Sequence, residues 1–355
     1  MLNRTSTGSR WHALADRVLA GGTATPADAL AILQAPDEAL LDLLAAAYRI
    51  RHHYFGNTVR LNFLVNAKSG LCPEDCNYCS QSRVSEAPIH KYPLMSQDEL
   101  VRLAERAVAL KASTCCIVLS GRGPSKKEVR HVAGATEEIK KRYPDLKVCA
   151  CMGLLSEADA RSLKDAGVDR YNHNLNTAES AYKAVCSTHT YQDRADTVEA
   201  TRKAGISPCS GIIVGMGETL EQLVEVAFSL CDLRADSIPV NFLLPIEGTP
   251  LGQGARPLTP RFCLRVLSMA RFVCPDREIR VSAGRERHLR SMQPLSLYPA
   301  NSLFVADYLT EPGQQAELDW RMIEDLGFEI EGLPAATVPK PGQRLPACPH
   351  RNELV

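Results

Sequence analysis

The segment Val59-Arg-Leu-Asn-Phe-Leu-Val65 leads into the stretch Gly70-Leu-Cys72-Pro-Glu-Asp-Cys76-Asn-Tyr-Cys79. The first part is a short run rich in apolar residues, which predicts a buried strand. The second part carries three cysteines with the spacing C-x3-C-x2-C in a polar loop. Together they form the first unit of an alternating pattern of strands and helices that continues to about residue 330.

Seven further runs of strand character follow, separated by helix signals. The runs are Thr114–Leu119, Lys147–Met152, Val168–Asn174, Ser207–Val214, Ser237–Leu244, Glu278–Ser282 and Ser302–Val305. Expected helix starts are Ser96, which forms a capping box with Glu99, and Ser156, Thr190, Thr219 and Thr259. Eight such units over about 250 residues predict an α/β fold, a closed (β/α)8 barrel of the TIM type. A doubly wound open sheet is the alternative, but no G-x-G-x-x-G follows an expected strand.

The loops after the strands of such a barrel face its catalytic end, so we expect the cysteine loop there. A helical extension precedes the barrel. Its expected helices cover 11–19, 26–33 after the cap Thr25, and 37–54 with Leu40, Leu41, Leu44 and Tyr48 on one face. Residues 1–10 are expected to form a loose tail. The chain thus divides into an N-terminal helical extension (1–56), the barrel (57–330) and a proline-rich tail (331–355) that is expected to be disordered.

The composition is that of an ordinary globular protein, with 45% apolar and 23% charged residues among 355. Lys and Arg together number 41, as do Asp and Glu, so no net field attracts nucleic acid or an anionic membrane. No uncharged apolar run of about 18 residues offers a membrane span, and no secretory signal is visible. We therefore expect a cytoplasmic protein that binds neither nucleic acid nor membrane.

The chain has 13 cysteines, an odd number that cannot pair fully. A reducing cytosol disfavours a disulfide scaffold, so metal ligation is the better hypothesis. Three thiolates, from Cys72, Cys76 and Cys79, can hold three irons of a [4Fe–4S] cluster and leave the fourth iron open to a small molecule. A zinc site would more often show a second Cys or His pair nearby, and none stands there.

This spacing is similar to that of the radical S-adenosylmethionine enzymes, and the whole loop Gly70–Ser82 resembles the cluster loop of the biotin synthase family. Four later motifs resemble those of the same family, in order and at family spacing. They are Tyr171-Asn-His-Asn-Leu-Asn176, Cys209-Ser-Gly211, Ile238-Pro-Val-Asn241 and Arg280-Val-Ser-Ala-Gly-Arg285. The resemblance implies that S-adenosylmethionine chelates the open iron and that its cleavage gives a 5′-deoxyadenosyl radical, which abstracts hydrogen from an unactivated C–H bond.

The resemblance also implies a [2Fe–2S] cluster held by Cys116, Cys149, Cys209 and Arg280. These residues lie in four different expected strands, and inward residues of different strands can meet at one depth. Cys115 must face away from Cys116, whereas Cys151, two residues after Cys149, is expected one layer away. A guanidinium is normally protonated and has no acceptor, so the alternative for Arg280 is a buried cation that balances the charge of the cluster.

The same motifs imply residues that bind the small molecules. For S-adenosylmethionine they are Tyr78, Asn174 and Asn176, and for the substrate dethiobiotin they are Asn172, Asn174 and Asn241. An amide offers both a donor and an acceptor, which suits a ureido ring. Asn176 stands where some members have an aspartate at the ribose, so its contact would lack charge assistance. His173 is expected to be structural, and the alternative for each Asn is a turn residue at a strand end.

The implied reaction is the insertion of sulfur into dethiobiotin to give biotin, with the second cluster, deeper in the barrel, as the sulfur donor. Further implied partners are an electron donor such as flavodoxin or ferredoxin, the iron–sulfur assembly machinery and a second copy in a homodimer. One alternative is a related radical enzyme that rearranges or cleaves its substrate without sulfur insertion. Another is a non-enzymatic iron–sulfur or zinc scaffold. Cys186, Cys231, Cys263, Cys274 and Cys348 match no motif and are expected to be incidental or buried residues.

Overall fold

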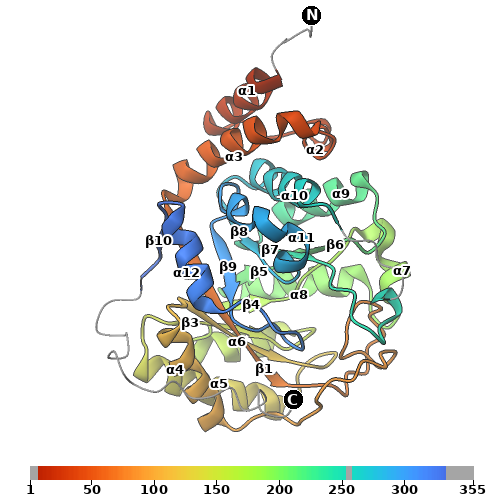
Figure 1. Cartoon of the computed structure of the whole chain (residues 1–355). Coiled ribbons are helices and arrows are strands. Elements are labelled where there is room, and N and C mark those ends of the chain that lie inside the picture. The colour runs from red at the N-terminus through yellow and green to blue at the C-terminus, as the bar shows by residue number, and fades with distance from the viewer. Residues whose placement is uncertain (1–6, 253–257, 333–355) are drawn as a thin grey trace, which may run out of the picture.

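The computed structural model describes residues 7–252 and 258–332 and contains a closed barrel of parallel strands. The strands are β1 Thr58–Lys68, β2 Thr114–Leu119, β3 Lys147–Cys151, β4 Arg170–Asn172, β5 Ser207–Cys209, β6 Ile212–Val214, β7 Ser237–Phe242, β8 Glu278–Val281, β9 Ser302–Val305 and β10 Glu329–Ile330. The order β1-β2-β3-β4-β5-β7-β8-β9 is closed by pairing of β9 with β1, and every pairing between named strands is parallel. The predicted (β/α)8 barrel is confirmed, and helices surround it (Figure 1).

The helices alternate with the strands after an N-terminal group of three. They are α1 Thr7–Leu19, α2 Pro26–Leu33, α3 Leu40–Phe55, α4 Gln97–Ala109, α5 Lys126–Arg142, α6 Glu157–Asp165, α7 Tyr182–Val185, α8 Tyr191–Lys203, α9 Leu220–Asp232, α10 Pro260–Val273, α11 Arg285–Leu289 and α12 Ala316–Asp325. All five predicted start residues are N-caps whose side chains accept a backbone N–H. Capping residues recognised in the sequence therefore predicted these helix starts correctly.

The fifth predicted strand, 207–214, is broken into β5 and β6. The break falls at Ser210-Gly211, where the backbone approaches β7 closely. A Cβ on Gly211 would lie 1.9 Å from the carbonyl oxygen of Pro239, so only glycine fits there. β6 still pairs with β7, so the barrel stays closed at this position.

The N-terminal helices lie outside the barrel, beside α9 and α10 (Figure 1). They share one apolar core with those two helices, to which Trp11, Ile32 and Leu43 contribute. The prediction for 37–54 needs two corrections. The segment begins with a separate 3-10 turn, Asp37–Ala39, and Leu41 is 69% exposed rather than on the buried face. The first helix also begins earlier than expected, at Thr7.

Strand β10 and helix α12 were not among the predicted elements. β10 has only two residues and pairs with the start of β1 outside the barrel, so its pattern is too short to distinguish it from a loop. The division of the chain at 56 and 330 stays a prediction, and most of the expected disordered tail, from 333 onward, lies outside the described residues.

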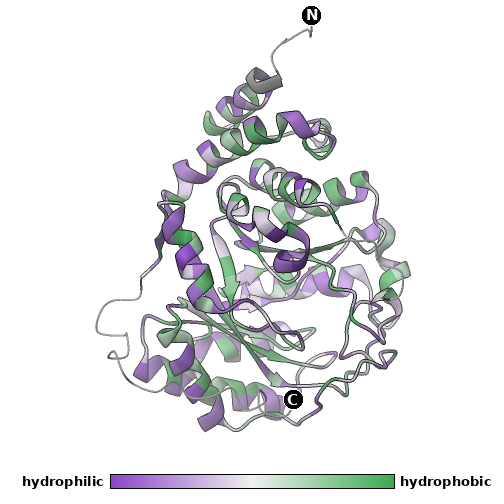
Figure 2. Cartoon of the chain, viewed as in Figure 1, coloured by the Kyte–Doolittle hydropathy of each residue, from purple (hydrophilic) through white to green (hydrophobic). Residues whose placement is uncertain are grey.

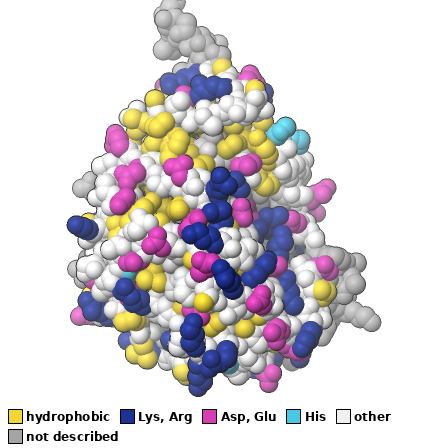
Figure 3. Space-filling view, turned by 180° about the vertical axis from the view of Figure 1, so that it is seen from behind, with side chains coloured by type: hydrophobic (Ala, Val, Ile, Leu, Met, Phe, Trp, Pro, Cys, Tyr) yellow, Lys and Arg dark blue, Asp and Glu magenta, His cyan; other side chains and the backbone are white. Residues whose placement is uncertain are grey.

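The distribution of charged side chains on the surface agrees with the equal numbers of acidic and basic residues in the sequence. Hydrophobic and hydrophilic residues share the same outer helices (Figure 2), as expected for helices that bury one face. On the face drawn in Figure 3, Lys and Arg side chains are interspersed with Asp and Glu. No helix among the described residues is long and apolar enough to cross a membrane.

Candidate functional site

The loop after β1 carries Cys72, Cys76 and Cys79, here called the loop cysteines. Cys76 is buried, and Cys72 and Cys79 are half-buried. Burial raises the pKa of Cys79 to about 11, and the nearby charge of Cys72 adds to this rise. The hydrogen bond with Cys186 and burial raise the pKa of Cys76, and the nearby charge of Cys79 adds to this rise. Cys79 and Tyr78 pack against Cys76, and Cys72 is close enough to influence the pKa of Cys79, so the three cysteines line one region, here called the loop site. A cation or an iron cluster would favour their thiolate forms.

Two carboxylates of the same loop anchor it to the segment before α8. Glu74 accepts hydrogen bonds from the Thr188 hydroxyl (2.6 Å) and from His189 Nδ1. Asp75 accepts from the backbone N–H groups of Ser187 (2.9 Å) and Thr188 (3.2 Å). These contacts fix the conformation of the loop without using its thiols.

The anchoring segment adds two groups to the loop site: Cys186, which was expected to be incidental, and His189, which no motif marks. The sulfur of Cys186 lies 3.7 Å from that of Cys76, and also 3.3 Å from His189 Nδ1. Cys76, Cys186 and His189 could together hold a metal ion, because their ligand atoms all lie within 4.8 Å of one another. No motif marks Cys186 or His189, since their approach to Cys76 depends on the tertiary path of the chain.

Helix α8 contributes a buried cation, Arg194, to the loop site. Its Nη2 lies 4.0 Å from the Cys76 sulfur, and its Nη1 donates to the backbone carbonyl of Asn174 (2.7 Å). Burial disfavours the charged form, but Tyr78, Tyr182 and Cys76 outweigh it and raise the pKa of Arg194 above its ordinary value. Arg194 therefore keeps a positive charge beside the loop cysteines.

Inside the barrel, the strands bring together Cys116, Cys149, Cys209 and Arg280, here called the interior set. Cys116 on β2 and Cys149 on β3 are direct partners in the strand register. The Cys149 thiol lowers the pKa of Cys116 by hydrogen bonding, and its own pKa is raised well above the ordinary value. Arg280 Nη1 lies 3.8 Å from the Cys209 sulfur. Cys116 and Cys149 also pack against Phe304, whose ring lies 5.0 Å from the Arg280 guanidinium, so all four residues line one region.

Arg280 is held by several neighbours at once. It donates to Glu278 (2.6 Å), to the Ser237 hydroxyl (2.9 Å) and to the Ser302 hydroxyl (3.3 Å). Its guanidinium also lies 5.0 Å from the centre of the Phe304 ring. Burial alone would lower the pKa of Arg280, but Glu278, Cys209 and Cys116 keep it above the ordinary value. The side chain is therefore a rigidly placed cation that presents Nη1 to a thiol.

The neighbouring cysteines lie as strand alternation predicts. Cys115 belongs to the apolar core between the barrel and its helices, whereas Cys116 packs with Cys149 and Phe304. Cys151 pairs in register with Val118, two positions beyond Cys116 along β2, which puts it one layer from the interior set. Burial raises its pKa to about 12.

A chain of contacts links the interior set to the loop site. Asn172 Nδ2 lies 3.1 Å from the Cys209 sulfur and 3.1 Å from Asn174 Oδ1. Asn174 in turn accepts from Arg194, which lies beside Cys76. Two of the predicted polar residues therefore stand between the two groups of cysteines.

Asn176 and Tyr78 meet at the loop site, where the Asn176 amide donates to the Tyr78 hydroxyl. Asn176 is buried in the left-handed region at φ 69°, and its Oδ1 has no hydrogen-bond partner among the described residues. A buried acceptor without a hydrogen-bond partner lowers the stability of the folded protein. It is suited to a hydroxyl donor from a bound molecule.

The remaining predicted positions have other partners. The Asn241 amide donates to the Ile212 carbonyl (3.1 Å) and accepts from the Ala283 N–H (3.3 Å), so it bridges neighbouring strands. His173 is buried, and burial lowers its pKa well below the ordinary value.

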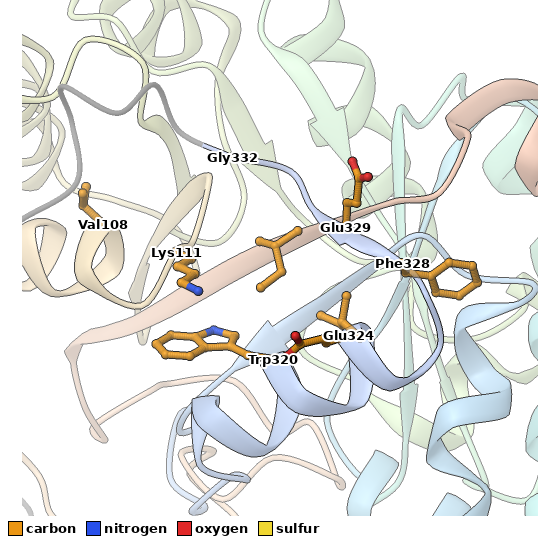
Figure 4. Close-up of a pocket in the computed structure, with 9 residues that line it drawn as sticks. Val108, Lys111, Trp320, Glu324, Phe328, Glu329 and Gly332 are labelled. Atoms are coloured by element: carbon orange, nitrogen blue, oxygen red, sulfur yellow. The ribbon is translucent and has the colours of Figure 1, made fainter.

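One surface pocket of about 460 Å³ lies outside the barrel, between α4, α12 and β10 (Figure 4). Its lining includes Val108, Phe328 and Trp320, and Lys111 Nζ lies 4.4 Å from the Trp320 ring. None of the loop cysteines and no member of the interior set lines it. It is a separate feature from the cysteine sites.

Comparison with known proteins covers almost the whole chain. The Radical SAM superfamily matches residues 68–230, and the Biotin and Thiamin Synthesis associated domain matches residues 239–329. A biotin synthase from Bacillus cytotoxicus is 59% identical over 321 residues, 90% of this chain and 96% of the relative. A biotin synthase from Bacillus mycoides is 57% identical over 330 residues, 93% of this chain and 99% of the relative.

Solved structures share the fold at low sequence identity. A methylornithine synthase superposes with a TM-score of 0.77 at 21% identity, over 89% of this chain and 97% of that one. An FeFe-hydrogenase maturase from Carboxydothermus hydrogenoformans gives 0.76 at 16% identity, over 91% and 79%. These structures support the barrel architecture.

Proposed function

Because this chain belongs to the biotin synthase family of radical S-adenosylmethionine enzymes, we propose that its two groups of cysteines hold the two clusters with which dethiobiotin is converted to biotin. The alternative of a related radical enzyme that inserts no sulfur is not favoured. The observation that carries the proposal is the interior set. It places three thiols and a fixed guanidinium within the barrel strands, apart from the loop cysteines.

We assign the [4Fe–4S] cluster to Cys72, Cys76 and Cys79. Their shared site and the neighbouring Arg194 support this assignment, because a buried cation offsets the negative charge of a thiolate-bound cluster. Glu74 and Asp75 hold the loop from outside, so the thiols stay available for iron.

We assign the [2Fe–2S] cluster to Cys116, Cys149, Cys209 and Arg280. The pairing of Cys116 with Cys149 and the 3.8 Å approach of Arg280 to Cys209 fit this donor set. Glu278 lies 2.6 Å from Arg280 Nη2 and can stabilise the guanidinium whichever role it takes, as a ligand or as a charge-balancing cation.

With both clusters and S-adenosylmethionine bound, the cofactors supply the 5′-deoxyadenosyl radical, the hydrogen abstraction and the sulfur. The chain supplies position and exclusion of water. Tyr78, Asn174 and Asn176 are proposed to bind S-adenosylmethionine, with the partnerless Asn176 Oδ1 accepting from a ribose hydroxyl. Asn172, Asn174 and Asn241 are proposed to bind dethiobiotin; Asn172 and Asn174 are placed for it between the two cysteine groups.

The working form is proposed to be a cytoplasmic homodimer, since a reducing compartment keeps the ligand thiols free. Flavodoxin or ferredoxin is proposed as the electron donor. The iron–sulfur assembly machinery would load both clusters.

The test is an iron and sulfide count with a Mössbauer spectrum of protein purified without oxygen. The proposal predicts about six irons per chain in two cluster types. About four irons in one type, even after reconstitution, would support the sulfur-free alternative, and zinc in place of iron would indicate a non-enzymatic scaffold.

A further inference from the structure

Two cysteines that match no motif meet at the other end of the molecule from the loop cysteines. Cys231 is the second-last residue of α9, and Cys274 is the C-cap of α10. Each helix ends there before the next barrel strand begins, whereas the loop cysteines follow the end of β1. The pair is therefore placed at the amino-terminal end of the barrel strands.

The two sulfur atoms are 2.8 Å apart. A disulfide has a sulfur–sulfur bond of about 2.05 Å, so a closure of less than about 1 Å would join them. Both thiols also contact carbonyls of the two helix ends: Cys231 lies 3.1 Å from that of Val273, and Cys274 lies 3.8 Å from that of Ala227. The helix ends thus hold the thiols facing each other.

A metal site does not explain this pair. Among the described residues, the one group of three possible metal ligands found close together is at Cys76, and it includes neither Cys231 nor Cys274. Cys231 is half-buried whereas Cys274 is 1% exposed, so Cys231 is the more accessible of the two residues. The Cys274 thiol and, to a lesser degree, Arg277 lower the pKa of Cys231 against the effect of burial and of Asp276 and Asp232, which favours its reactive thiolate.

We propose that Cys231 and Cys274 form a reversible disulfide that joins α9 to α10 when the protein meets an oxidised low-molecular-weight disulfide. The Cys231 thiolate attacks one sulfur of the reagent and releases the other as a thiolate. Cys274 then attacks the mixed disulfide at Cys231, loses its proton and releases the second thiolate. In total the two cysteines lose two protons and two electrons, and one reagent disulfide becomes two thiols.

This bond would act as a structural staple rather than as part of catalysis. α9 and α10 share an apolar core with α1, α2 and α3, so a covalent link between them strengthens the side of the barrel that carries the N-terminal helices. The staple uses none of the cysteines proposed as cluster ligands. The inference is therefore independent of the proposed function.

The experiment treats the full chain, with its clusters loaded and without oxygen, with oxidised glutathione. Free thiols are then alkylated under denaturing conditions, and the digest is analysed by mass spectrometry. We expect a peptide pair linked through Cys231 and Cys274 that disappears after dithiothreitol. Cys263, buried in α10, serves as the internal control and should be recovered alkylated.

Two variants test the order of the steps. Cys274→Ser should accumulate a glutathione adduct on Cys231, whereas Cys231→Ser should leave Cys274 unmodified. The oxidised wild-type chain should also unfold at a higher temperature than the reduced chain, and neither variant should show this difference. A wild-type chain that carries the Cys231 adduct without the linked pair, or that shows neither, would overturn the proposal whether or not the variants fold.

Discussion

At the scale of single residues, Cys76 and Cys186 show how two neighbouring thiols can differ in role. Their sulfur atoms are 3.7 Å apart, and both are buried. Cys76 belongs to the C-x3-C-x2-C loop. Cys186 lies outside this loop and within hydrogen-bonding range of the loop residue Asp75 (3.2 Å) and of His189 (3.3 Å). Because only Cys76 belongs to the cysteine motif, we expect Cys76 rather than Cys186 to bind iron.

We expect Cys76→Ala to abolish formation of 5′-deoxyadenosine, because the cluster would lose one of three iron ligands. Cys186→Ala is the matched control. It should keep the [4Fe–4S] absorption and lose no more than about tenfold in rate, as expected from about 1 kcal/mol for one lost hydrogen bond. Loss of the cluster in the control would mean that Cys186 is itself a ligand and that the loop assignment is incomplete.

Asn176 allows a test of the cofactor contact without backbone strain, since glycine readily adopts its φ of 69°. Asn176→Gly should raise the KM for S-adenosylmethionine about five- to tenfold, because one hydrogen bond of about 1–1.5 kcal/mol is lost. Arg234→Gly, at an exposed position with φ 53°, is the control and should leave this KM unchanged. An equal KM in both variants would argue against the ribose contact.

Side-chain alternation was predictable at this scale, and tertiary contacts were not. The period of two along β2 correctly separates Cys115 from Cys116, because a strand has only two faces. The approach of Cys186 to Cys76 depends on carboxylates that pair across more than a hundred residues, such as Asp75 with Ser187. No local pattern encodes such a pairing.

At the scale of elements, α8 connects helix capping to the loop site. Its N-cap Thr190 forms a capping box with Asp193, and the next residue, Arg194, reaches Cys76. The residue before the cap, His189, contacts Glu74 in the loop. The start of α8 therefore positions both His189, before the cap, and Arg194, after it, beside the loop cysteines.

Thr190→Ala should reduce the free energy of unfolding by about 1 kcal/mol through loss of the cap. It should also slow cleavage of S-adenosylmethionine, because fraying of the first turn frees Arg194. Ser96→Ala removes the equivalent capping box of α4 and should cost similar stability without slowing cleavage. Urea unfolding and a 5′-deoxyadenosine assay measure the two effects, and equal cleavage rates in both variants would contradict this role of α8.

The starts of helices were more predictable from the sequence than the breaks and buried faces within helices and strands. A cap uses only a few consecutive residues, so Ser156 or Thr219 could be recognised locally. The break between β5 and β6 could not, because it follows from the contact of Gly211 with Pro239 on another strand. Leu41 was misplaced because the 3-10 turn before α3 changes the phase of the apolar pattern.

At the scale of the whole molecule, a network of charged side chains links strands across the amino-terminal end of the barrel. Glu278 on β8 accepts hydrogen bonds from Arg60 on β1 and Arg170 on β4, each at 2.7 Å, and from Arg280 at 2.6 Å. Burial would raise the pKa of Glu278, but the three guanidinium groups outweigh it and hold the pKa well below its ordinary value. One carboxylate thus ties together strands from distant parts of the chain.

Glu278→Gln should lower the free energy of unfolding at neutral pH by about 3–5 kcal/mol, because the buried cations Arg170 and Arg280 and the half-buried Arg60 lose their shared anion. In the wild type, the ionised carboxylate is favoured by folding. Its stabilisation is therefore present above the unfolded pKa of about 4.3 and is lost as the pH falls toward the lower folded pKa. Urea unfolding as a function of pH should show a shallower acid limb in the variant, and identical limbs would contradict the assignment.

The same network has a consequence for the route by which small molecules reach the interior of the barrel. Because these ion pairs occupy the amino-terminal end of the barrel, we expect a molecule bound at the interior set to enter from the end that carries the loop cysteines. If dethiobiotin binds deeper in the barrel than S-adenosylmethionine, as proposed above, it should bind first, and biotin should leave only after 5′-deoxyadenosine has dissociated. A barrel with one entrance imposes an ordered mechanism, and the order of binding and release would then limit the turnover of this enzyme.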